Sequence, residues 1–380
     1  MMAPSLRVPF DGTDLGDGKS QAPGLCNTFL GVKHDFRPFA ASRFSLASVD
    51  ATCIRDIAGV LQEVLDASSL DAVDGGVPKL CGRLHFTLSW GCRRFGRAAM
   101  QPLHAAASAK GAPTLSPSLR AALTFLRDIL VDPSSKEVRL RPRRFDYRRA
   151  ALPTVLIWSD ARWERTDSSP AGIGFVVFFP ATTEAQRAAA TARTPPWLGG
   201  AETPPGEWLF AAYDLRPDEY SHWRERSQYI GQLELLAAIA VYYSLAQRLR
   251  GRRVIHAVDN TGAMACLIND YSTDVDSAAH VHSFWALAVA LDVDVWFVFV
   301  NSAANIADWP SRGLVAFAAD LGASRVEGSD LRLPPREMWG SVDAAVAAAG
   351  VSAPPLRSRS RAKRSAPSDV SGASSKAPRA

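Results

Sequence analysis

The sequence predicts an α/β protein with a mixed five-stranded sheet flanked by helices, preceded by a mainly helical region. Three strand-like apolar runs follow one another in residues 154–215, and two more lie in residues 253–301. Segments with apolar residues at helical spacing alternate with the later runs. Consecutive strands followed by alternating helices and strands are typical of a mixed sheet with helices on its faces.

The composition is that of a globular protein. The chain has 380 residues, 47% hydrophobic and 21% charged, which is enough to bury two or three cores. It has no apolar run of the ~18 residues that a membrane span needs, and its start lacks the apolar centre of a signal peptide. The five scattered cysteines form no CxxC pair, which fits a reducing compartment and argues against a zinc site or a disulfide framework. We therefore expect an intracellular protein without a membrane partner.

Basic residues are concentrated in two segments. Residues 357–380 carry seven Lys and Arg and one Asp, a net +6, so the rest of the chain holds 5 − 6 = −1 of the formal +5. The basic tail, residues 351–380, is expected to be disordered and favours the nucleus over the cytoplasm. Residues 136–149 hold seven basic and two acidic residues just before the first strand of the main sheet. This segment either holds a polyanion near that strand or is a solvated connection.

In the first half of the chain, we expect residues 1–26, rich in Gly, Pro and Asp, to be disordered. Residues 28–36 form a short strand-like segment, and the helix that follows has Ser48 or Asp50 as its cap. Helices are expected at residues 48–66, at residues 79–107 as a pair interrupted by Gly, and at residues 116–131 with Pro117 in the first turn.

The second half carries the predicted sheet. Strands are expected at residues 154–161, 171–180, 208–215, 253–260 and 293–301. Helices are expected at residues 228–249, 261–270 with Thr261 as cap, 276–292, and from residue 305. The Pro/Gly/Ala-rich insertion at residues 181–206 can be looped out of the sheet at little cost. Gly172 and Gly174 form a GxG inside a strand, not at the start of a helix, which argues against a phosphate-binding loop.

Four acidic residues stand beside these elements and suggest a metal site. Asp160 ends the first strand, Glu234 lies in the middle of the long helix, Asp259 ends the fourth strand, and Asp308 opens the last helix. A buried cluster of carboxylates repels itself unless divalent cations neutralise it. Each acid alone is ordinarily a turn, cap or helix-surface residue, but four in these contexts predict a shared site for Mg²⁺, or Mn²⁺, at one end of the sheet.

The order Asp–Glu–Asp–Asp on strand, helix, strand end and helix start resembles the ribonuclease H domain of retroelement (LTR/DIRS-like) reverse transcriptases. The segments FLGVKHDF and KLCGRLHF resemble the end of the palm and the thumb or connection region of those enzymes. The resemblance implies a polymerase remnant at residues 27–150, a ribonuclease H-like domain at residues 151–322 and a C-terminal extension at residues 323–350. The YxDD sequence that polymerization needs is missing, so we expect no polymerase activity.

The resemblance also implies a substrate and a mechanism. Two Mg²⁺ ions held by the four acids would cleave the RNA strand of an RNA–DNA hybrid. Asn260, Asn305 and Ser311 would contact ribose hydroxyls and Arg312 the backbone. A polymerase subunit or domain encoded upstream is the expected protein partner. The loop before Asp308 has no histidine, unlike cellular members, and this predicts a slower enzyme. Two other interpretations stay open: a catalytically inactive, nucleic-acid-binding relic of the domain, and a structural domain that scaffolds a polymerase.

Overall fold

The main sheet has six strands in the order β10-β7-β6-β5-β8-β9. In the computed structural model its strands are β5 (Val155–Trp163), β6 (Ala171–Pro180), β7 (Gly206–Asp214), β8 (Arg253–Val258), β9 (Asp294–Phe299) and β10 (Ser324–Arg325). The first three form an antiparallel meander, and β8 and β9 run parallel to β5. The predicted mixed sheet is therefore confirmed, but the predicted number of five strands was wrong. The sixth, β10, pairs in parallel with β7 and is only two residues long, too short to leave a pattern in the sequence.

The structure describes residues 25–29, 31–92, 95–108, 115–140, 142–146, 153–164, 170–184, 186, 188, 205–328 and 330–351. The expectations for residues 1–24, for residues 352–380 of the basic tail and for most of the insertion fall outside these residues. Cys26, expected to end a disordered segment, is instead the first residue of the strand β1 (Cys26–Phe29). The two ends of the insertion are described. Pro180 and Gly206 are partners in the β6–β7 register, so the chain leaves and re-enters the sheet at one point.

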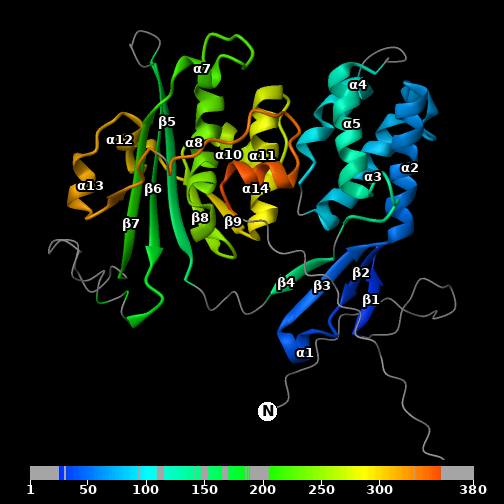
Figure 1. Cartoon of the computed structure of the whole chain (residues 1–380), viewed down its shortest axis with the longest axis horizontal. Helices are drawn as coiled ribbons and strands as arrows, with labels where there is room; N and C mark the ends of the chain where they lie inside the picture. Colours follow the sequence, from blue (N-terminus) through cyan, green and yellow to red (C-terminus); the bar gives the residue numbers. More distant parts are fainter. Residues whose placement is uncertain are drawn as a thin grey trace, which may run out of the picture.

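Helices cover both faces of the main sheet, as Figure 1 shows. On one face lie α8 (Ile230–Ser244), α10 (Thr261–Asn269), α11 (Val275–Leu291) and α14 (Val342–Ala348). On the other lie the short helices α12 (Asp308–Ser311) and α13 (Ala316–Asp320). Helix α8 is buried almost all round because it packs between the sheet and α11, which explains its apolar composition on every side.

Helix ends follow the local sequence. The Asp50 carboxylate accepts hydrogen bonds from the Thr52 and Cys53 N–H groups at the start of α2 (Ala51–Ala67), which confirms Asp50 as the cap. Ser116 caps α5 (Pro117–Leu130), with proline at its first position as predicted. The prediction that Thr261 caps α10 was wrong. Asn260 takes that place, because its side chain reaches the N–H of Ala263.

The region before the main sheet is mainly helical, as predicted, but it also contains a small sheet that was not predicted. It contains helices α2, α3 (Gly76–Gly91), α4 (Gln101–Ser108) and α5. It also contains a four-stranded antiparallel sheet of β1 (Cys26–Phe29), β2 (Val32–Asp35), β3 (Phe44–Val49) and β4 (Arg143–Asp146). The segment expected as one strand is a hairpin, turned at Gly31 with φ of 78°. Strand β4 comes from the basic segment and pairs with β3, so this part of the segment is an edge strand and not a free connection.

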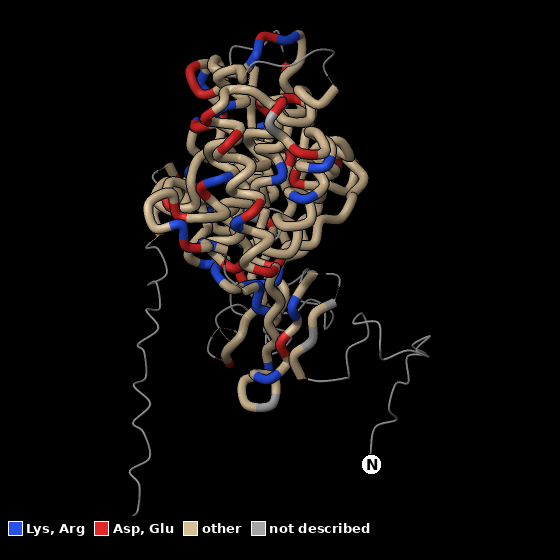
Figure 2. The backbone as a smooth tube through the Cα atoms, turned by 90° about the vertical axis from the view of Figure 1, so that its right-hand side faces the viewer, with Lys and Arg blue, Asp and Glu red and all other residues tan. Residues whose placement is uncertain are grey.

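The remaining helical elements are short. They are α1 (Phe39–Ser42), α7 (Pro217–Tyr220), α9 (Ala246–Leu249) and the 3-10 turns η1 (Leu70–Ala72), η2 (Ala98–Met100) and η4 (Ser302–Ala304). None of the described helices has the length and apolar character to cross a membrane. Lys and Arg alternate with Asp and Glu over the body, without a large area of one sign in the view of Figure 2.

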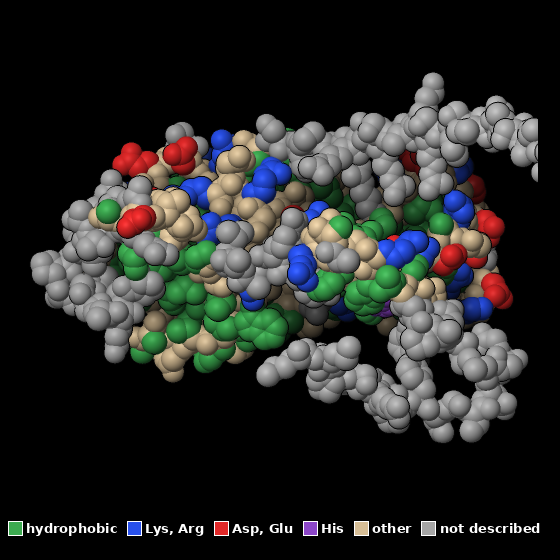
Figure 3. All heavy atoms as spheres, turned by 90° about the horizontal axis from the view of Figure 1, so that it is seen from below, with side chains coloured by type: hydrophobic (Ala, Val, Ile, Leu, Met, Phe, Trp, Pro, Cys, Tyr) green, Lys and Arg blue, Asp and Glu red, His purple; other side chains and the backbone are tan. Residues whose placement is uncertain are grey.

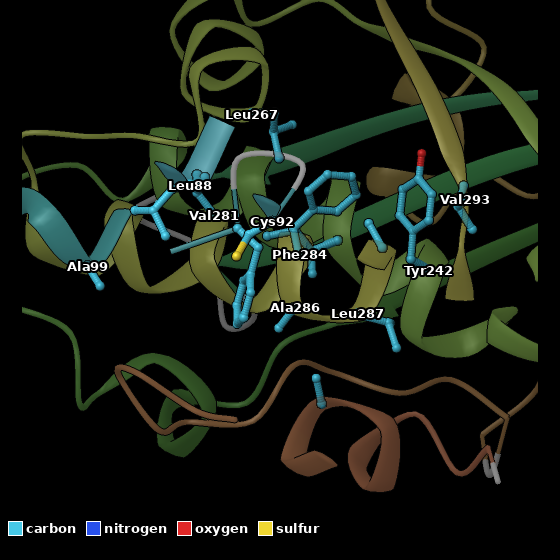
Figure 4. Close-up of a cluster of buried hydrophobic side chains, with 14 of the residues drawn as sticks. Leu88, Cys92, Ala99, Tyr242, Leu267, Val281, Phe284, Ala286, Leu287 and Val293 are labelled. Carbon is cyan, nitrogen blue, oxygen red and sulfur yellow. The ribbon is translucent and has the colours of Figure 1, made fainter. Parts of the chain in front are cut away.

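The helical region and the main sheet share one hydrophobic core. Figure 4 shows Leu88, Cys92 and Ala99 beside Val281 and Phe284 of α11. Polar contacts cross the same boundary: the Arg97 N–H donates to Asp270, and the Gln101 side chain donates to the Thr273 carbonyl. Residues far apart in sequence therefore stabilise one another, and α11 is held on both sides.

Candidate metal centre

Strand pairing brings Asp160 and Asp259 together. The parallel register of β5 and β8 ends at the pair Ser159–Val258, so Asp160 and Asp259 are the next residues on neighbouring strands. Asp160 was expected to end its strand, but β5 continues to Trp163 because its other edge stays paired with β6. Asp160 therefore projects from a rigid strand beyond the end of β8. It is buried, whereas Asp259 is half-buried.

Glu234 reaches the same place from α8, which packs on β5 and β6. Its carboxylate accepts a hydrogen bond from the backbone N–H of Ala161. That N–H lies beyond the end of β8, where β5 has no parallel partner. The second carboxylate oxygen, Oε2, is buried without a hydrogen-bond partner among the described residues. A buried carboxylate oxygen left in this state is costly unless it binds a proton or a cation.

The three acids form one ligand set. One ligand oxygen from each of Asp160, Glu234 and Asp259 lies within 4.8 Å of the other two. Carboxylate oxygens are hard ligands, which Mg²⁺, Mn²⁺ and Ca²⁺ prefer. The set and the orphaned Oε2 atom of Glu234 fit a divalent cation, so this buried triad can hold a metal ion.

Burial and mutual repulsion set the protonation of these groups. Burial raises the pKa of Asp160 to about 6, and the charges of Asp259 and Asp308 add to the shift, while the hydrogen bond from Ser311 opposes it. Burial also raises the pKa of Glu234 well above its ordinary value, with the same neighbouring carboxylates adding to it. Carboxyl groups with pKa values perturbed by burial and by one another are candidates for a functional site.

Asp308 lies beside the triad without joining it. It is the first residue of α12, on the opposite face of the sheet from α8 (Figure 1), and its side chain is 34% exposed. The Arg312 Nε donates to its Oδ1 at 2.9 Å, and the same guanidinium lies 3.3 Å from Glu164. Asp308 is close enough to raise the pKa of both Asp160 and Glu234. The structure thus brings three of the four predicted acids together and places the fourth next to them.

Ser311 links α12 to the triad. It is 1% exposed, and its hydroxyl lies 2.5 Å from Asp160 Oδ2 and 2.8 Å from the Asp308 carbonyl oxygen. Its side chain is therefore engaged inside the protein, although we expected it to contact substrate. The hydroxyl fixes the plane of the Asp160 carboxylate and ties it to the helix that carries Asp308.

The two predicted asparagines also have internal partners. Asn305 is buried, donates from its amide to the Ser159 carbonyl and accepts the N–H of Ala307, so it joins the loop before α12 to β5. Asn260 caps α10, as described above. Of the four residues expected to contact substrate, Arg312 is the exposed one, with 46% of its side chain accessible.

Sequence reasoning missed the residues that let α12 approach the sheet. Gly174 is the β6 partner of Asp160, and a Cβ atom there would lie 2.3 Å from the backbone nitrogen of Ser311. A Cβ at Gly172 would lie 2.5 Å from the Ser311 carbonyl oxygen. Arg162, two residues after Asp160, donates to that same carbonyl and pairs with Asp214 at 2.7 Å. The GxG pattern was the available signal, because alternate glycines in a strand mark a close backbone approach.

A series of hydrogen-bonded, buried polar side chains lies next to the acidic triad. His256 is fully buried on β8, with Nδ1 3.1 Å from the Tyr242 hydroxyl and Nε2 2.9 Å from the Ser159 hydroxyl. Burial lowers the pKa of His256 to about 3, so the ring is neutral and can donate at one nitrogen and accept at the other. These hydrogen bonds join α8, β8 and β5, and they end at Ser159, the residue before Asp160.

No protein-family model matches this chain, and no curated protein matches it.

Proposed function

We propose that this protein is a divalent-cation-dependent nuclease that hydrolyses the RNA strand of RNA–DNA hybrids, as the ribonuclease H part of a retroelement reverse transcriptase. One observation carries the proposal: acids from β5, α8 and the end of β8 meet within 4.8 Å, with Asp308 of α12 beside them. The order of these acids along the chain and the elements that carry them are those of the ribonuclease H-like fold that the sequence resembles.

The architecture supports the same proposal. An antiparallel meander followed by two parallel strands, with α8 between the third and fourth strands, matches the element order expected from the resemblance. The extra strand β10 and helix α14 are additions at the C-terminal side, in the region assigned to an extension.

Asp160, Glu234 and Asp259 would hold the cation, with Asp308 completing the set. Mg²⁺ is the proposed ion, and Mn²⁺ would fit the same oxygen ligands. When bound, divalent cations supply an activated water and stabilise the leaving oxygen in phosphodiester hydrolysis.

The protein's own groups would prepare the site for this chemistry. Ser311 orients the Asp160 carboxylate from one side, and β5 holds it rigidly beyond the end of β8. Arg312 is half exposed beside the site, and its guanidinium can bind a backbone phosphate if it leaves Asp308 or Glu164. Because Asn305 and Ser311 are engaged internally, we assign them to positioning and not to ribose recognition.

Hybrid cleavage tests the proposal. The full chain is incubated with a hybrid labelled on its RNA strand, in buffer with Mg²⁺, Mn²⁺ or a chelator. We expect divalent-ion-dependent cleavage of the RNA strand by the wild type and none by Asp160→Asn, which keeps the shape of the side chain and removes its charge. The same strand in single-stranded form, and a DNA duplex of the same sequence, should stay intact.

The two other functions correspond to other outcomes. Tight hybrid binding without cleavage would favour a catalytically inactive nucleic-acid-binding relic, and neither binding nor cleavage would favour a structural domain of a polymerase. The orphaned Glu234 Oε2 favours the active enzyme, because a relic gains nothing by keeping a buried carboxylate without a partner.

A further inference from the structure

Strand β9 stands at one end of the strand order of the main sheet. It pairs with β8 on one side, and no other strand among the described residues lies on its other side. The N–H groups of Asp294 and Val300 donate to β8 or to the residue before it. Because successive N–H groups of a strand point to opposite sides, those of Val295, Phe297 and Phe299 point away from the sheet.

Most of this edge lacks the charges, prolines and bulges that protect an edge strand against pairing. Residues 295–300 contain no charge and no proline, and β9 pairs with β8 residue for residue without a bulge. Trp296 is 71% exposed and Phe299 54% exposed. Ile255, the β8 partner of Trp296, is 38% exposed on the same face of the sheet. Seen from below, hydrophobic side chains gather over the part of the molecule that holds the main sheet (Figure 3).

We propose that β9 pairs antiparallel with β9 of a second copy of this chain, about a two-fold axis through Phe297. In this register the outward backbone groups of Phe297 pair with those of the partner's Phe297, and Val295 pairs with the partner's Phe299. Trp296 then lies opposite the partner's Val298 and covers it. The two six-stranded sheets become one continuous sheet.

A second copy fits this edge better than an unrelated ligand. A two-fold contact needs a surface that is complementary to itself, and an uncharged strand of apolar residues meets that need. Asp294, the one charged residue of β9, lies opposite the partner's Val300, so like charges do not meet. The absence of Lys and Arg from β9 argues against nucleic acid as the occupant.

The exposed apolar area is smaller than that of a standard interface and fits a weak, reversible dimer. From their exposed fractions, Trp296 and Phe299 offer roughly 300 Å² per copy. Ile255 and the backbone edge add to this, against the ~800 Å² per partner of a standard interface. We therefore expect dissociation in the micromolar range. The inference does not depend on nuclease activity, because the acidic triad lies beyond the end of β8 and not on β9.

Sedimentation of the full chain over a range of concentrations up to about 100 μM tests the dimer. We expect a monomer–dimer equilibrium for the wild type, and a dissociation constant raised at least tenfold in Trp296→Lys and in Phe299→Lys. Leu314→Lys is the matched control. It changes an apolar residue that is 58% exposed on the turn after α12, away from β9, and should dimerise like the wild type.

Circular dichroism of each variant shows whether the fold is kept, and two exposed positions are tested so that one misfolded variant does not decide the result. The inference is overturned by a wild type that stays monomeric over the whole range. It is equally overturned by a dimer that both lysine variants leave unchanged, or by open-ended oligomers, which a two-fold contact cannot form.

Discussion

Gly174→Ala should damage the site without touching any acidic residue. The new Cβ would lie 2.3 Å from the Ser311 nitrogen, 2.7 Å from the Pro310 carbonyl carbon and 2.8 Å from the Ser311 Cα. All three are backbone atoms, so no side chain can turn aside, and α12 must move away from the sheet by roughly 0.7 Å or more. Overpacking of this kind costs about 1–3 kcal/mol of folding free energy.

The displacement also acts on the acids. The Ser311 hydroxyl now lies 2.5 Å from Asp160 Oδ2, and a shift of this size takes it beyond the usual range of an O–H···O hydrogen bond. Asp308 moves with the same helix. A misplacement of about 1 Å at a catalytic site costs on the order of 10²-fold in rate, so we expect hybrid cleavage to fall by about that factor.

The assay compares thermal unfolding and hybrid cleavage of the wild type, Gly174→Ala and a control, Gly59→Ala. Gly59 lies in the middle of α2 with nothing within 4 Å of its added Cβ, so alanine there should stabilise the helix by ~0.5–1 kcal/mol. A Gly174→Ala protein that melts and cleaves like the wild type would refute the reasoning, because α12 would then not need its close approach to β6.

The remaining predictions concern the charges of the site. Adding Mg²⁺ or Mn²⁺ should raise the melting temperature of the wild type and not that of Asp160→Asn, since a ligand stabilises only the state that binds it; equal shifts in both proteins would place the cation elsewhere. In chelator, the stability of the wild type relative to Asp160→Asn should fall as the pH rises from about 4 to 7. The comparison removes the opposite trend of the buried histidines, whose lowered pKa values make stability rise over the same interval in both proteins. The pKa of Asp160 is raised to about 6 in the folded protein, so its proton is bound more tightly there than in the unfolded chain and its loss costs about 3 kcal/mol. The pKa of Glu234 is shifted in the same direction. A chemical-denaturation series in which the wild type gains stability relative to Asp160→Asn over this pH interval would contradict the assignment for Asp160. Arg312→Ala should lower hybrid cleavage at least tenfold and stability by no more than about 1 kcal/mol, because its ion pairs with Asp308 and Glu164 are half exposed. A large loss of stability with unchanged cleavage would make this arginine structural.

Local sequence was sufficient for most elements of the main sheet. The apolar runs of β5, β6, β8 and β9 and the caps of α2 and α5 are set by residues within a few positions of one another. Strand β10 and the four-stranded sheet were not predictable in this way. Their strands are short, and β4 and β10 form because a partner distant in the chain, β3 or β7, offers its edge.

The candidate acids could be selected from the sequence, because carboxylates beside several apolar runs are costly when buried unless they are paired or bind a cation. The distances between the acids could not be read from the sequence. Whether Asp160 and Asp259 are neighbours depends on the register of β5 and β8, and the place of Asp308 depends on how closely α12 approaches Gly174. Likewise Ser311 and Asn305 were selected as polar residues near the site, and only burial decided that they hold the site together instead of facing substrate.

The sequence by itself thus determined which elements form and which residues carry charge, since propensity, apolar period and capping act over a few residues. The tertiary structure decided that three of these charges share one site and that a fourth lies beside it, paired with Arg312. It also decided that no strand among the described residues pairs with the outer edge of β9. The physical reason is that strand register and helix approach are fixed by contacts between segments that are distant in the chain, which no short stretch of sequence contains.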